Sequence, residues 1–252
     1  MSTLAENRER LEDAIAQACR KAGRSRDEIE LMAVSKTYPA ATIAEAASLG
    51  LTLFGENRVQ EFAAKAPELA EMRSIRVHLI GHLQSNKALR AAELFDGIDS
   101  LDTLRLARRL DDAASKLAKR LPVLIEVKLS PEETKEGVDP DSGEAARLLE
   151  LLPDLPHVEM RGLMTIAPWG APDEVTRACF HSLREWRDKW AAKHPRLSFD
   201  VLSMGMSGDF SLAIEEGATR IRIGTALFGK REPYTPPQRQ TPVAGDPGKG
   251  PA

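Results

Sequence analysis

The sequence has little cysteine and no long apolar run. Only Cys19 and Cys179 occur among 252 residues, and they lie far apart in segments with a helical pattern. This excludes a disulfide framework and favours a reducing compartment. No run approaches the ~18 consecutive apolar residues of a transmembrane helix. The first residues, MSTLAENRERLEDAI, include acids and no apolar core, so we expect no signal peptide and a cytoplasmic location.

A strong excess of charge of either sign is also absent. Lys and Arg number 35 and Asp and Glu number 38, which gives a net charge of −3. Such a chain lacks the basic face that broad nucleic-acid binding requires and the polybasic surface that anionic membranes attract. Hydrophobic residues make up 42% and charged residues 29%. This composition is ordinary for a soluble globular protein, and we expect neither nucleic acid nor membrane among its partners.

The C-terminal segment differs in composition from the rest of the chain. Residues 231–252 hold six of the 16 prolines and three glycines. A segment of this kind cannot build a packed core, so we expect a disordered tail. We therefore expect one folded domain over residues 1–230.

Eight short apolar segments alternate with longer helical patterns in this domain. The predicted strands are Leu31–Ser35, Leu51–Phe54, Arg76–Ile80, Gly97–Ser100, Val123–Val127, Val158–Met164, Phe199–Leu202 and Ala218–Ile223. A helix that ends near Gly23 precedes them. We expect Asp102 to cap a second amphipathic helix, Ser85 to cap another, and a long helix to follow Pro172. This order predicts a single-domain (β/α)8 TIM barrel with an extra N-terminal helix, and a doubly wound open sheet is the alternative.

One lysine stands at the point where a barrel carries its function. Catalytic and binding residues of such barrels follow the carboxyl ends of the strands. Lys36 directly follows the first predicted strand, in the segment AVSKTYPA. A desolvated lysine there has a lowered pKa and can form a Schiff base with an aldehyde or ketone. An ordinary surface lysine at a strand exit is the alternative.

Two turns of small residues follow the last two predicted strands. Ser203–Ser207 lies before a helix, and Gly224 and Thr225 follow the eighth strand. Backbone N–H groups of such turns bind phosphate. The first and eighth strands are neighbours in a closed barrel, so Lys36 would lie near this site, as pyridoxal 5′-phosphate (PLP) requires. Arg222 shares a strand face with Gly224 and could meet the pyridine nitrogen, or it could form a structural ion pair.

Several motifs in order resemble those of the pyridoxal phosphate homeostasis proteins, the YggS/PROSC family. They are AVSKTYPA, FGENRVQE, HLIGHLQSNK, GLMTIAP and LSMGMSGDFSLAIEEGATRIRIGTALFG, and the resemblance spans about residues 5–230. His82 stands where proline is also common in relatives. The family is a single-domain barrel similar to the N-terminal domain of alanine racemase, of fold type III.

The resemblance also implies the roles of individual residues. Lys36 would carry PLP as a Schiff base, Asn57 and Met206 would lie near the cofactor, and Arg222 would face the pyridine nitrogen. The residues implied around the phosphate are Ser203, Ser207, Gly224 and Thr225. Family members bind and buffer PLP in the cytosol without established catalytic turnover. PLP-dependent apoenzymes are candidate acceptors, and the chain would be a monomer or a weak dimer.

Other functions and sites have less support in the sequence. An amino-acid racemase needs two bases, and alanine racemases take one of them from a tyrosine in a second domain. We expect no such domain in this sequence, which has only Tyr38 and Tyr234. A Schiff-base aldolase would use Lys36 without PLP. We expect no metal site, because His78 and His82 have no third ligand at a suitable spacing.

Overall fold

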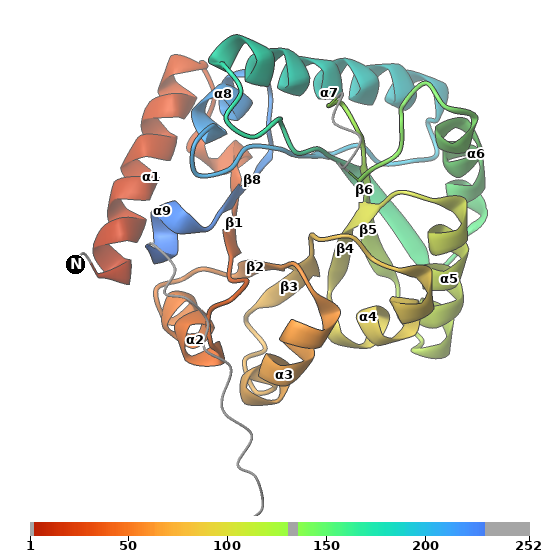
Figure 1. Cartoon of the computed structure of the whole chain (residues 1–252), viewed down its shortest axis with the longest axis horizontal. Coiled ribbons are helices and arrows are strands. Elements are labelled where there is room, and N and C mark those ends of the chain that lie inside the picture. Colours follow the sequence, from red (N-terminus) through yellow and green to blue (C-terminus); the bar gives the residue numbers. More distant parts are fainter. Residues whose placement is uncertain (1–2, 131–135, 230–252) are drawn as a thin grey trace, which may run out of the picture.

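The chain folds into one closed barrel of parallel strands surrounded by helices (Figure 1). A computed structural model describes residues 3–130 and 136–229. The strands are β1 (Glu30–Val34), β2 (Leu53–Glu56), β3 (Arg76–Leu79), β4 (Gly97–Leu101), β5 (Leu121–Glu126), β6 (Val158–Met164), β7 (Val201–Ser203) and β8 (Arg220–Ile223). They pair in chain order, and β8 closes the barrel against β1. The predicted (β/α)8 barrel is confirmed, and the open sheet is excluded.

The helices lie outside the strands and cover them (Figure 1). They are α1 (Leu4–Lys21), α2 (Ala40–Ser48), α3 (Val59–Leu69), α4 (Ala88–Leu94), α5 (Leu104–Lys116), α6 (Gly143–Leu151), α7 (Asp173–Lys193), α8 (Phe210–Glu215) and α9 (Thr225–Phe228). Short 3-10 turns occupy Arg26–Glu28, Ser85–Lys87 and Leu152–Asp154. No helix among the described residues is long and apolar enough to cross a membrane. The expected disordered tail, 231–252, lies outside these residues.

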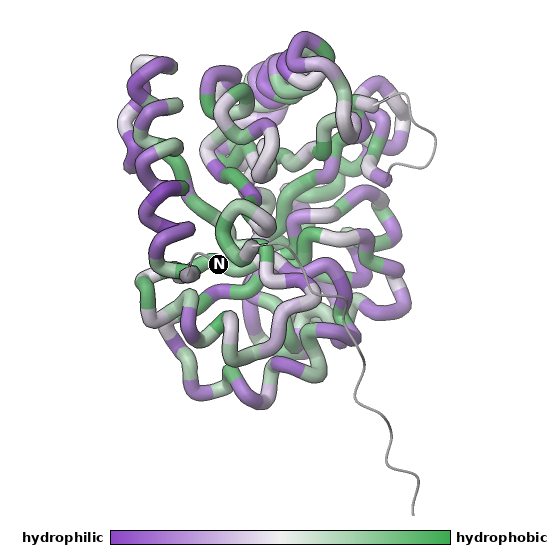
Figure 2. Tube along the Cα trace, turned by 60° about the vertical axis from the view of Figure 1, so that its left-hand side comes forward, coloured by the Kyte–Doolittle hydropathy of each residue, from purple (hydrophilic) through white to green (hydrophobic). Residues whose placement is uncertain are grey.

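The extra N-terminal helix is confirmed, and it packs against α8 and α9. Thr3 and Glu6 form a capping box at its start, and Gly23 with φ +67° follows its end. Leu11 and Ile15 are buried on its inner face. Figure 2 shows hydrophilic and hydrophobic residues alternating along this helix, as its amphipathic pattern predicts.

Several predicted boundaries are corrected by the structure. The second strand is Leu53–Glu56, two residues later than predicted. Thr103, not Asp102, caps α5, because its hydroxyl accepts the hydrogen bond from the Leu106 N–H at 3.3 Å. Ser85 begins a 3-10 turn and caps no helix with its side chain.

The barrel interior combines an apolar half with a buried layer of charge. Met32, Val34, Leu53 and Ile80 form a small inner apolar cluster. Beside it, alternate residues of β8 point inward, so Arg220 and Arg222 are both buried in the barrel while Ile221 and Ile223 join the outer core. The position of Arg222 inside the barrel is as predicted.

Arg220 belongs to an ion-pair layer below the carboxyl end of the barrel. Its guanidinium pairs with Asp99 at 3.0 Å and with Glu30 at 2.8 Å, and His78 Nδ1 lies 2.8 Å from Asp99. Burial alone would raise the pKa of Asp99, but His78 and Arg220 hold it below its usual range. This layer fixes the inner face of β8 beneath Arg222.

Candidate functional site

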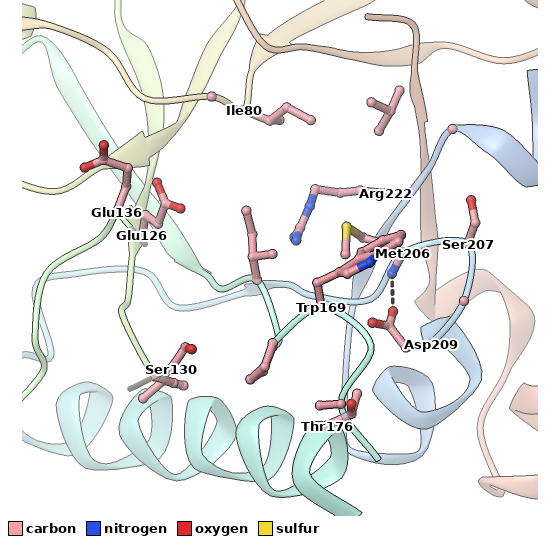
Figure 3. Close-up of a pocket in the computed structure, with 18 of the residues that line it drawn as sticks. Ile80, Glu126, Ser130, Glu136, Trp169, Thr176, Met206, Ser207, Asp209 and Arg222 are labelled. Atoms are coloured by element: carbon pink, nitrogen blue, oxygen red, sulfur yellow. Dashed lines mark hydrogen bonds between the residues drawn. The ribbon is translucent and has the colours of Figure 1, made fainter. Parts of the chain in front are cut away.

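A cavity of about 600 Å³ opens at the carboxyl ends of the strands (Figure 3). Seven of the eight residues predicted for the site line it: Lys36, Asn57, Met206, Ser207, Arg222, Gly224 and Thr225. Ser203 does not line it. The hydroxyl of Ser203 is buried behind Arg222, so the structure does not place this residue at the surface of the cavity.

Lys36 stands on a turn that is fixed from both sides. The hydroxyl of Ser35 donates to Glu56 Oε1 at 2.7 Å, and the N–H of Thr37 donates to Glu61 Oε1 at 2.5 Å. Thr37 has φ +71°, a conformation that residues with a Cβ rarely adopt. The ammonium group of Lys65 holds both carboxylates at 2.9 Å. These contacts set the direction in which Lys36 leaves the barrel wall.

Arg222 presents its guanidinium to the cavity in a fixed orientation. Nη1 donates to the carbonyl oxygen and hydroxyl of Ser203 at 2.7 and 2.9 Å, and Nη2 donates to the carbonyl oxygen of Thr165 at 2.8 Å. Burial lowers the pKa of Arg222. Among the described residues it forms no salt bridge, so the ion-pair alternative applies to Arg220 and not to Arg222. The arginine is therefore held as a buried hydrogen-bond donor.

The two small-residue turns meet beside Lys36 and form an anion cup. Ser207 Oγ accepts the hydrogen bond from the Ala226 N–H at 3.2 Å and so joins the turns after β7 and β8. The N–H groups of Ser207, Gly208 and Thr225 donate to no acceptor among the described residues. Gly205 has φ +94°, and a Cβ there would lie 2.6 Å from Ala213 Cβ. Three free N–H donors on one wall have the chemistry that a phosphate needs.

The sequence analysis did not identify three other residues of this cavity. Burial raises the pKa of Glu126, the last residue of β5, to about 7. Asp209 accepts the Met206 N–H at 2.5 Å and fixes the turn after β7 (Figure 3). Trp169 lines the cavity although 88% of its surface is exposed. A carboxylate as the last residue of a buried strand is the signal that could have revealed Glu126.

Two carboxylates lie near His82 that the spacing along the sequence does not indicate. The loops after β3, β4 and β5 bring His82, Asp102 and Glu136 together, with the ligand atoms within 4.8 Å of one another. Asp102 does not cap α5, and its Oδ2 lies 3.3 Å from His82 Nδ1. His78 is not part of this group, because its ring pairs with Asp99.

Comparison with known proteins agrees with this geometry. The structure is a closed parallel barrel with a lysine after β1 and an anion cup after β7 and β8. Residues 7–232 match the family described as the alanine racemase N-terminal domain, which is the class of barrel to which the chain belongs. The alanine racemase of Streptomyces coelicolor A3(2) shares the fold with a TM-score of 0.68 at 16% identity, and the match covers 90% of this chain and 57% of the racemase.

Closer relatives define the family within that class. A protein of Vibrio cholerae named "Pyridoxal phosphate homeostasis protein" is 42% identical over 240 residues, covering 92% of this chain and 98% of the relative. PipY of Synechococcus elongatus, solved with PLP bound, is 44% identical with a TM-score of 0.77, covering 85% of this chain and all of PipY. The chain belongs to the pyridoxal phosphate homeostasis protein family.

Proposed function

We propose that this chain binds PLP at the barrel mouth and buffers or delivers it in intracellular PLP homeostasis, without catalytic turnover. The observation that carries this proposal is the meeting of Lys36, Arg222 and three free N–H donors in one cavity. Two findings on relatives support this proposal: curated relatives are named pyridoxal phosphate homeostasis proteins, and PipY was solved with PLP bound. We further propose residues 1–230 as the single PLP-binding domain.

The residues of the cavity fit the three recognisable parts of PLP. The free N–H groups of Ser207, Gly208 and Thr225 would hold the phosphate, and Gly224 lies in the same wall. The bound group would supply an aldehyde. The Nζ of Lys36 would attach to the aldehyde carbon as a Schiff base, with release of one water, and water or another amine can reverse this bond. Reversibility is what a carrier requires.

Arg222 supports holding rather than turnover. Its guanidinium is always a donor, so it would give a hydrogen bond to the pyridine nitrogen and keep that nitrogen unprotonated. An unprotonated ring is a weaker electron sink than PLP enzymes use for carbanion chemistry. The role of Ser203 would then be to orient Arg222 through the two hydrogen bonds it accepts. Asn57 and Met206 would contact the ring from the sides.

Among the residues that the structure describes, no tyrosine lines this cavity to serve as the base of a racemase. Tyr38 does not line it; its hydroxyl donates to the carbonyl oxygen of Gly229 at 3.0 Å, and its ring packs on Phe228. Tyr234 lies outside the described residues. We propose a cytoplasmic carrier that acts as a monomer or weak dimer, with PLP-dependent apoenzymes as its acceptors.

Borohydride reduction tests the attachment point. The chain incubated with PLP should absorb in the visible range, and reduction followed by peptide mass analysis should place a pyridoxyl group on Lys36. Lys36→Ala should lose the reducible adduct. Lys128→Ala is the matched control, because Lys128 lines the same cavity and should keep it. An adduct that persists in Lys36→Ala, or that disappears only in Lys128→Ala, would contradict the assignment. A chain that stays colourless with PLP would favour the aldolase alternative.

A further inference from the structure

A second group of titratable side chains lies at the rim of the cavity, away from the anion cup. His82 follows β3, Asp102 follows β4, and Glu136 follows β5. Asp102 is buried, whereas the side chains of His82 and Glu136 are 42% and 56% exposed. Burial and the neighbouring Glu136 raise the pKa of Asp102, although His82 opposes the shift. Two carboxylates at this spacing disfavour each other's charge unless a cation lies between them.

The distances within this group are compatible with a coordination shell. His82 Nδ1 lies 3.3 Å from Asp102 Oδ2 and 3.6 Å from Glu136 Oε2. The shorter distance also allows a hydrogen bond between His82 and Asp102, whereas the longer one exceeds the ~2.7–3.2 Å of an N–H···O hydrogen bond. Ligand atoms placed tetrahedrally around zinc, at bond lengths of about 2.0–2.2 Å, are separated by about 3.3–3.6 Å. Rotation of the exposed Glu136 side chain can close the remaining distance to Asp102.

Glu126 provides an independent observation in the same cavity. Only 6% of this residue is exposed, and its side chain makes no hydrogen bond or salt bridge to any described residue. Figure 3 shows its carboxylate in the cavity on the side of Glu136, and both Asp102 and Glu136 act on it electrostatically. The carboxylate of Glu126 accepts no hydrogen bond from any described residue, although the positive charge of Arg222 also acts on it, so its oxygens are available to a cation.

We propose that His82, Asp102 and Glu136 bind a divalent transition-metal ion of the zinc type at the rim of the cavity, where the carboxylate of Glu126 adds negative charge. Imidazole with carboxylates suits zinc and its neighbours, whereas calcium and magnesium prefer oxygen ligands alone. The site uses no residue of the anion cup and does not depend on Lys36. It therefore stands or fails separately from PLP binding.

Zinc titration of the untagged full chain, stripped of PLP and metals, tests this site. Isothermal calorimetry with zinc chloride should show one zinc per chain. His82→Ala should bind zinc at least about tenfold more weakly, because even the loss of a group that only orients a ligand costs about 10–100-fold in affinity. Glu136→Gln should weaken binding in the same direction. Both substitutions are at exposed side chains, so they should leave the thermal unfolding midpoint of the metal-free chain unchanged.

Two further variants separate the possible outcomes. His194→Ala removes a histidine at the end of α7 that does not line the cavity, and it should bind zinc as the unaltered chain does. Lys36→Ala should also bind zinc normally, whether or not it retains PLP. Equal affinity in the unaltered chain and His82→Ala would overturn the proposal. An equal loss in His82→Ala and His194→Ala, which indicates unspecific surface binding, would overturn it too.

Discussion

The buried ammonium group of Lys65 should be the largest single electrostatic contribution to the site's rigidity. Lys65 is 8% exposed, and its Nζ donates to Glu56 Oε1 and Glu61 Oε1 at 2.9 Å and to the Ser35 carbonyl at 3.2 Å. Glu56 is fully buried, and burial raises its pKa. Its Oε2 has no partner among the described residues. Lys65→Met keeps the aliphatic stem and leaves Glu56 without its counter-charge.

Breaking a buried pair by removing one partner destabilises a protein by about 3–5 kcal/mol. For a domain of this size, that lowers the unfolding midpoint by roughly 6–20 °C. Glu56→Gln in the Lys65→Met background removes the stranded charge, so the double variant should recover much of the loss. Lys116→Met, at an exposed position on α5, is the control and should change stability by less than about 0.5 kcal/mol.

Urea and thermal unfolding of the unaltered chain, Lys65→Met, Glu56→Gln and the double variant would measure this coupling, with Lys116→Met as the control. The two single losses should not add, and a coupling energy above about 1 kcal/mol is expected for groups in direct contact. A Lys65→Met chain within about 1 kcal/mol of the unaltered one would refute the reasoning, since that difference is ordinary for a substitution of no special importance. Strictly additive losses would also refute it, because they would mean that Lys65 and Glu56 do not act on each other.

Three other predictions address the cavity. Burial raises the pKa of Glu126 to about 7 from 4.5, so the folded chain binds this proton more tightly than the unfolded chain. Stability should therefore fall by up to about 3 kcal/mol as pH rises from 4.5 through 7. Urea unfolding at a series of pH values, with a chelator present, should show a smaller fall in stability for Glu126→Gln than for the unaltered chain. Parallel pH profiles of the two chains would contradict this prediction. Gly205→Ala should lower the free energy of unfolding by about 2–4 kcal/mol, because the residue has a positive φ and its new Cβ would overlap Ala213 Cβ. Gly208→Ala, with open space around its Cβ, should cost much less, and equal unfolding midpoints would argue against the geometry. PLP should quench the fluorescence of Trp169, which lines the cavity; Trp169→Phe should lose most of the quench and Trp186→Phe should keep it, and the reverse result would place the ligand elsewhere.

The sequence predicts the barrel because its evidence is local. Apolar segments and amphipathic helices alternate, and all eight predicted strands overlap the observed ones. The predictions are wrong at element boundaries, where two neighbouring residues could each begin a strand or cap a helix. Leu51 is buried and apolar like a strand residue, yet β2 begins at Leu53. Asp102 and Thr103 can both cap a helix, and only the packing of Asp102 against His82 leaves the cap to Thr103.

The site is predictable where it depends on strand ends and not where it depends on contacts between elements. Residues that follow the strands of a barrel converge, so Lys36 and the two turns could be placed in one cavity. The pairing of Lys65 with Glu56 depends on how α3 packs over β1 and β2, which no local pattern encodes. The meeting of His82 with Glu136 depends in the same way on the path of the loop after β5.

Closure of the barrel is the step that turns separate motifs into a site. Met32 pairs with Arg222 and Ala33 with Ile223, so the residues after β1 and after β8 leave the barrel side by side. Contacts from outside the sheet secure this seam. The side chain of Asn7 in α1 donates to the carbonyl oxygen of Leu227 at 2.9 Å. Lys36 follows one strand of this pair, and Gly224 and Thr225 of the anion cup follow the other. Any movement of one strand against the other therefore changes the distance between the proposed attachment point and the proposed phosphate site. The N-terminal helix is thus part of the structure that holds the cavity in shape.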